Sequence, residues 1–138
     1  MSKIIRLILA IAALIALVPV ASGQTSMHVT PVEIAQLPRF CWGQLEVPDA
    51  KSDEFRISGC GPAANHYCSA LIYMIRARAN VKKQVRLNLL GHADADVRYT
   101  ERAIADYPKC EIREHVVATR AALNNLITMY GGKRPKAQ

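Results

Sequence analysis

The residues of this chain with the widest choice of chemistry are its four cysteines, Cys41, Cys60, Cys68 and Cys110. Thiolates can attack a substrate, hold a soft metal ion or oxidise to disulfides. All four cysteines lie downstream of an apolar N-terminal segment that has the pattern of an export signal. In an oxidising compartment, an even set of cysteines pairs by default. We therefore predict two disulfides and no free thiol.

A metal site built from Cys60, His66 and Cys68 is the sharpest alternative. Thiolate sulfur and imidazole nitrogen suit copper(I) or zinc. However, His66 and Cys68 are two residues apart on a predicted helix and point about 200° away from each other. Disulfides would also consume both thiolates. We expect no cofactor, and we keep a periplasmic copper- or zinc-binding protein as the alternative function.

Two further histidines have an acidic residue four positions away: His92 with Asp96, and His115 with Glu111. This spacing puts both members of a pair on one face of a helix, where they could ligate a cation. It more often produces a side-chain pair on a solvated surface. We predict such pairs here.

No catalytic motif stands out in the chain. The sequence has no Gly-x-Ser-x-Gly nucleophile elbow, no Cys-x-x-Cys redox pair and no glycine-rich phosphate loop. Cysteines that are joined in disulfides leave no thiolate nucleophile. We expect a protein that is not an enzyme.

The N-terminal segment 1–23 reads as a signal peptide. Lys3 and Arg6 precede an unbroken apolar run over residues 7–18, and Ala21-Ser22-Gly23 supplies small residues for cleavage before Gln24. The run is short of the ~20 residues that span a bilayer. We expect cleavage and no stable membrane span afterwards, although an uncleaved anchor stays open.

The charge of the chain is basic. The formal net charge is +7, of which Lys3 and Arg6 belong to the signal segment. Such an excess favours anionic surfaces, for example lipid headgroups or cell-wall polymers, and it is also common on an ordinary solvated surface. Since no aromatic residues are interleaved with the basic ones, we expect no nucleic-acid partner.

Residues 24–59 predict an irregular arm. Pro31, Pro38 and Pro48 lack backbone N–H groups and bias their predecessors away from helix. The arm also carries apolar residues that should lie across the rest of the domain: Leu37, Phe40, Trp42 and Leu45.

Residues 60–132 predict three helices, and residues 133–138 predict a disordered basic tail. The first helix begins near Gly61-Pro62, the second covers about 84–107, and the third runs from Cys110 to Gly131-Gly132. Apolar residues recur at three- and four-residue spacing in each. We expect these residues to form one apolar stripe along each helix. The stripe of the first helix is Ala64, Cys68, Leu71, Ile72, Ile75 and Ala79; that of the second is Leu87, Leu90, Ala93, Val97, Ile104 and Tyr107; and that of the third is Ile112, Val116, Thr119, Leu123, Leu126 and Tyr130. The fold class is all-α.

The segment Ala103-Ile104-Ala105-Asp106-Tyr107-Pro108 resembles the join between consecutive tetratricopeptide units. Two further segments, Leu37-Pro38-Arg39-Phe40-Cys41-Trp42 and Asn65-His66-Tyr67-Cys68, are similar to those of small exported bacterial proteins that are mostly uncharacterised. The resemblance implies a helical exported scaffold, and tetratricopeptide-like faces bind extended peptides. On that basis Trp42, His66, Tyr67 and Tyr73 are candidate binding residues.

Helix order favours one pairing among the three that four cysteines allow. If the helices run up, down and up, the first and third have their N-terminal ends on the same side, where Cys60 and Cys110 lie. Cys68, inside the first helix, is then left to meet Cys41 in the arm. The resemblance supports the pair Cys41–Cys68, because its two segments centre on these cysteines. The other connectivities stay open.

The sequence therefore predicts an exported, disulfide-stapled, three-helix antiparallel array that is tetratricopeptide-like and carries an irregular N-terminal arm. We expect a binding or scaffolding role with a protein partner, in the bacterial periplasm or outside the cell.

Overall fold

The computed structural model describes residues 27–45, 47, 50 and 53–133. The predicted signal segment and most of the predicted tail lie outside these residues. The described part is all-α, as predicted, and contains no strand. None of its helices is long and apolar enough to cross a membrane.

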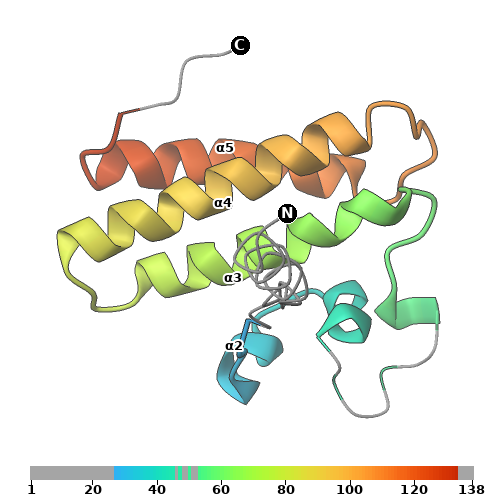
Figure 1. Ribbon diagram of the computed structural model, residues 1–138, viewed down its shortest axis with the longest axis horizontal. Coiled ribbons are helices and arrows are strands. Elements are labelled where there is room, and N and C mark those ends of the chain that lie inside the picture. Colours follow the sequence, from blue (N-terminus) through green and yellow to red (C-terminus); the bar gives the residue numbers. More distant parts are fainter. Residues whose placement is uncertain (1–26, 46, 48–49, 51–52, 134–138) are drawn as a thin grey trace, which may run out of the picture.

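Three long helices form the body of the protein: α3 (His66–Arg78), α4 (Lys83–Ala103) and α5 (Arg113–Met129). The middle helix α4 runs antiparallel to the other two and packs against both (Figure 1). A 3-10 helix over Pro62–Asn65 leads into α3. The second helix ends at Ala103 rather than near Tyr107, and the third begins at Arg113 rather than at Cys110. The intervening turn is closed by bonds from the amide of Tyr107 to the Ile104 carbonyl (3.0 Å) and from that of Cys110 to the Tyr107 carbonyl (3.0 Å).

Each of the two turns between long helices is fixed by an arginine that donates to backbone carbonyls of the preceding helix end. Arg86 donates to Ala77 O (2.8 Å) and Ala79 O (3.1 Å). Arg113 donates to Ile104 O (2.6 Å) and Tyr107 O (2.9 Å). Carbonyls at or just past a helix end lack the i+4 amide that would be their partner inside a helix, so a guanidinium is a favourable additional donor to them. Each arginine ties the start of one helix to the end of the helix before it.

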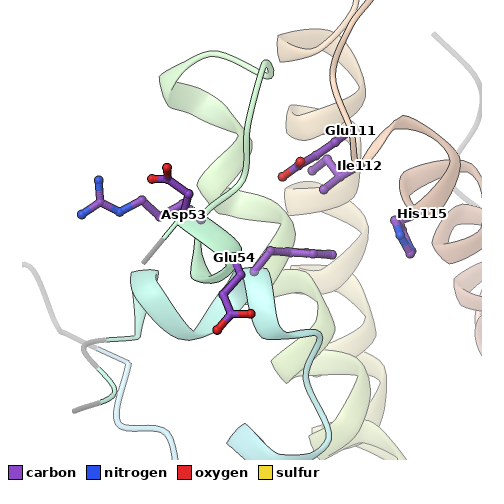
Figure 2. A pocket seen from close by; sticks show the side chains of 7 residues that line it. Asp53, Glu54, Glu111, Ile112 and His115 are labelled. Carbon is purple, nitrogen blue, oxygen red and sulfur yellow. The ribbon is translucent and has the colours of Figure 1, made fainter. Parts of the chain in front are cut away.

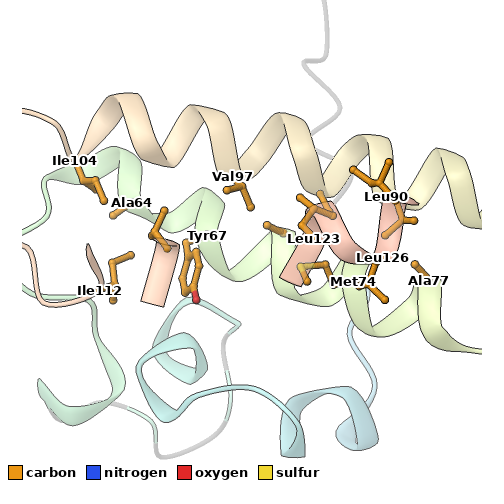
Figure 3. Close-up of a cluster of buried hydrophobic side chains, with 14 of the residues drawn as sticks. Ala64, Tyr67, Met74, Ala77, Leu90, Val97, Ile104, Ile112, Leu123 and Leu126 are labelled. Carbon is orange, nitrogen blue, oxygen red and sulfur yellow. The ribbon is translucent and has the colours of Figure 1, made fainter. Parts of the chain in front are cut away.

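The main core lies among the three long helices (Figure 3). The predicted stripes of α4 and α5 are largely buried, but Tyr107 is exposed, as is Ala79 at the end of α3. The main core receives a different set of α3 residues from the predicted one: Tyr67, Ala70, Met74 and Ala77. Cys68 and Ile72, from the predicted stripe, face a second cluster instead. Helix α3 is therefore buried on two sides.

The arm that covers the other side of α3 has no long element, as predicted, but its described residues include short helical turns. It contains the short helix α2 (Pro31–Ala35) and 3-10 helices over Arg39–Gln44 and Asp53–Phe55. A capping box between Thr30 and Glu33 starts α2. As predicted, apolar arm residues lie across the helical part: Leu37 and Cys41 are buried against Cys68 and Ile72, with Phe40, Trp42 and Leu45 packed beside them.

Two kinds of cross-link hold the arm to α3. The first is an ion pair in which Arg76 Nε lies 2.5 Å from Glu33 Oε1. Its hydrogen bond lowers the pKa of Glu33 from its usual 4.5 to about 2, so the carboxylate is ionised at any pH near neutrality. The second is the disulfide Cys41–Cys68, with 5.5 Å between the Cα atoms.

The other disulfide, Cys60–Cys110, joins the segments that lead into α3 and α5, with 4.3 Å between the Cα atoms. These are the two pairs that helix order favours. Beside this bridge, Gly61 has a φ of 72°, and a Cβ on it would lie 2.5 Å from the Tyr107 ring. Only glycine fits both that backbone and that contact.

Candidate functional site

The four aromatic residues that the sequence proposes for binding do not gather at one place. The Trp42 ring stacks on Phe55 in the arm, with 5.7 Å between centroids, and its Nε1 is the one buried side-chain polar atom without a partner among the described residues. Tyr67 belongs to the main core, where its hydroxyl lies 2.8 Å from Thr119 Oγ1. Burial raises the pKa of Tyr67. His66 and Tyr73 lie on α3 beside α4.

The predicted pair His92–Asp96 is wrong, because both residues contact α3 instead of each other. Asp96 Oδ1 lies 3.1 Å from His66 Nδ1, and the His66 ring lies 4.2 Å from that of Tyr99. The His92 ring stacks on Tyr73 at 5.1 Å. These residues link two helices.

The alternative metal site loses its ligands in this fold. Cys60 and Cys68 belong to different disulfides, and the four cysteines leave no free thiol. His66 is engaged with Asp96. Across the described residues, no group of three or more histidine, cysteine or acidic side chains is arranged to hold a metal ion.

The predicted pair His115–Glu111 is also wrong, but the two residues line one cavity. Glu111 Oε1 accepts a hydrogen bond from the Ser58 amide (2.6 Å), and the His115 ring meets Phe40 edge-on at 5.6 Å. The cavity has a volume of about 240 Å³. Figure 2 shows Asp53 and Glu54 of the arm, and Glu111, Ile112 and His115 at the start of α5, arranged around it. Phe40 and Arg56 complete its lining.

A second cavity has a volume of about 350 Å³ and shares one lining residue, His115, with the first. Its walls are the arm at Gln36 and Pro38 and helix α5. Its remaining lining comes from α3 and α5: Tyr67, Leu71, Met74, Ile75, Arg78, Ala118, Thr119 and Ala122. We call the two cavities together the arm–α5 groove. From His115 to Ala122 the groove follows two turns of α5, about 10 Å.

The arm–α5 groove changes character along its length. The end beside Phe40 carries three carboxylates, Asp53, Glu54 and Glu111, together with Arg56. This is notable in a chain with 18 basic and 11 acidic residues. Glu54 also lies 3.8 Å from the exposed Arg39, and Glu111 accepts from the Ser58 amide. The middle is apolar and built from small or flexible side chains, among them Met74 and Ala118. The far end carries Arg78, because α3 and α5 run parallel and α3 ends there.

A network of charges on α4 and α5 holds one side of the groove in place. Arg120 of α5 donates to Asp94 (2.5 Å) and to both oxygens of Glu101 (2.9 and 2.8 Å), and Arg98 also donates to Asp94 (2.8 Å). Asp94 is buried, so it needs these partners. The network ties α5, which carries His115 and Ala118, to α4.

No model of a known protein family matches this chain, and no curated protein or solved structure matches it.

Proposed function

We propose that this protein is exported to the bacterial periplasm or beyond, and that it binds an extended segment of a protein partner in the arm–α5 groove. The role is one of binding or scaffolding rather than catalysis. The observation that carries the proposal is the open groove with an apolar middle and an acidic end. The two disulfides, which suit an oxidising compartment, and the signal-like segment 1–23 support export.

The lining of the groove defines the chemistry of the partner segment. An extended strand rises about 3.3 Å per residue, so three residues cover the ~10 Å between His115 and Ala122. The apolar middle favours side chains such as leucine or valine. The carboxylates of Asp53 and Glu54, which line the same cavity as Phe40, favour a lysine or arginine at that end through charge, and the Phe40 ring adds cation–π attraction.

Ala118→Trp tests the proposal by filling the apolar middle of the groove. Ala118 is exposed and lines the groove, so a larger ring should block the partner without disturbing the core. We expect co-purification of the partner from the envelope fraction to fall at least about tenfold, as for the loss of a central apolar contact.

Val117→Trp is the matched control, because Val117 is the next residue on α5, is 67% exposed and does not line the groove. This variant should retain the partner. Equal retention by the two variants would rule out the arm–α5 groove as the binding site, provided that both proteins keep the unfolding temperature of the wild type.

A further inference from the structure

At the end of the molecule opposite the acidic cavity, the ends of all three long helices meet. Arg86 of α4 donates to the carbonyls that end α3, and its guanidinium lies 4.3 Å from the ring centroid of Tyr130, just past α5. A Cβ on Gly131 would lie 3.3 Å from Lys83 Nζ, so the start of α4 and the end of α5 are in contact. Figure 1 shows α4 beginning and α5 ending on the same side.

This end carries exposed basic residues, and the acidic side chains close to it are already paired: Glu33 with Arg76, and buried Asp94 with Arg98 and Arg120. Arg78, Lys82, Lys83 and Lys133 are exposed, and none of them forms an ion pair within the described residues. No aspartate or glutamate occurs in residues 77–93 or 123–133, which supply the end of α3, the start of α4 and the end of α5. We call these four residues the basic end.

Helix stability does not explain the basic end. Lys82 is the N-cap of α4 and Lys83 its first residue, and the first turn holds no acidic residue. The N-terminus of a helix carries partial positive charge and favours anions, so two lysines there are unfavourable for the isolated helix. An anionic partner bound at this end would interact favourably with both the lysines and the helix N-terminus, and would offset their mutual repulsion.

Two exposed apolar side chains accompany the basic residues. Val85, in the first turn of α4, is 46% exposed, and Met129, the last residue of α5, is 69% exposed. Basic residues with apolar neighbours are the combination that binds the interface of a membrane containing anionic lipids. A soluble polyanion would use the lysines but not the apolar pair.

We propose that the basic end binds the surface of a membrane that contains anionic phospholipids. Lys82, Lys83 and Lys133 contact the headgroups, and Val85 and Met129 enter the interfacial layer. The proposal does not depend on a partner in the arm–α5 groove. Arg78 lines the far end of that groove, but Lys82, Lys83, Lys133, Val85 and Met129 do not line it.

Co-sedimentation with vesicles tests the proposal. The purified protein should bind vesicles of phosphatidylglycerol and phosphatidylcholine more tightly than vesicles of phosphatidylcholine alone, and salt should weaken the difference. The double variant K82E/K83E should lower the partition coefficient by at least about tenfold. Its fold should be retained, because glutamates are favourable at the start of a helix.

The matched control is R102E/K109E, which makes the same change in net charge with exposed residues at the other end of α4. It should lower binding less than about threefold. Equal losses in the two double variants would overturn the proposal, because net charge alone would then explain the binding.

A third variant separates the membrane from a soluble polyanion. V85S/M129S should weaken vesicle binding severalfold and leave binding to polyphosphate unchanged. If vesicle binding is unaffected and polyphosphate binds as tightly as the vesicles, the basic end is a polyanion site and the membrane proposal is wrong.

Discussion

Replacing Cys60 and Cys110 together with alanine is expected to lower the free energy of unfolding by about 4 kcal/mol. The bridge closes a loop with a sequence separation of 50, so it removes much of the conformational freedom of the unfolded chain. It also joins the segments that lead into α3 and α5. These two helices are otherwise connected chiefly through α4, which packs against both. Urea unfolding followed by circular dichroism measures the loss.

The outcome that contradicts this expectation is a loss below about 1 kcal/mol in the double alanine variant. The bridge would then constrain neither the unfolded chain nor the two helix ends. Single cysteine variants are unsuitable, because each would leave an unpaired buried thiol.

Replacing Cys41 and Cys68 together with alanine is expected to lower the free energy of unfolding by about 3–4 kcal/mol, because the disulfide closes a loop with a sequence separation of 27. The structural consequence should differ from that of the first bridge. Cys41 lies in the arm, whereas the main core among α3, α4 and α5 does not include this disulfide. We therefore expect the arm to open before the three long helices unfold.

Amide hydrogen exchange measures this difference. In the wild type the amides of Leu37 and Cys41 donate to Ile34 O (3.0 Å) and Pro38 O (2.9 Å), so they should be protected. In C41A/C68A the protection of these amides should fall, while that of α4 and α5 should remain. Retained protection in the arm would show that Glu33–Arg76 and the apolar contacts hold it without the bridge.

The sequence was sufficient to predict the three helices and the disulfide pairing, because both depend on features that are local or follow from helix order. The stripes of α4 and α5 were recognisable because each helix buries mainly one side. The stripe of α3 was misassigned, since this helix buries Tyr67 and Met74 on one side and Cys68 and Ile72 on another. Periodicity alone cannot separate two buried sides.

Contacts between distant segments account for the other errors. The spacing of His92 and Asp96 was compatible with a pair on one helix, but His66 and Tyr73 of α3 provide closer partners. The helix at Pro31–Ala35 was not predicted, although the sequence contains the residues of its capping box, Thr30 and Glu33. The groove had no comparable signal in the sequence, because its wall depends on contacts such as Glu33–Arg76, which are 43 residues apart. The resemblance to exported bacterial proteins and to tetratricopeptide units stays a prediction.

The two proposals together describe a scaffold with two attachment points. In these proposals the basic end would bind an anionic lipid surface, and the groove would bind a segment that carries a basic residue near Asp53 and Glu54. The disulfide Cys41–Cys68 connects these roles to the fold, because it holds the arm in the position where Gln36 and Pro38 form one wall of the groove.

The central claim is that a protein partner occupies the arm–α5 groove, and site-specific photo-crosslinking in living cells tests it most directly. A photoreactive phenylalanine analogue is placed at position 118, inside the groove, or at position 117, outside it. We predict a discrete cross-linked product from position 118 and none from position 117, with the attachment point in a partner segment that contains apolar residues and a lysine or arginine. Cross-links of equal yield from both positions, or from position 117 alone, would contradict the account.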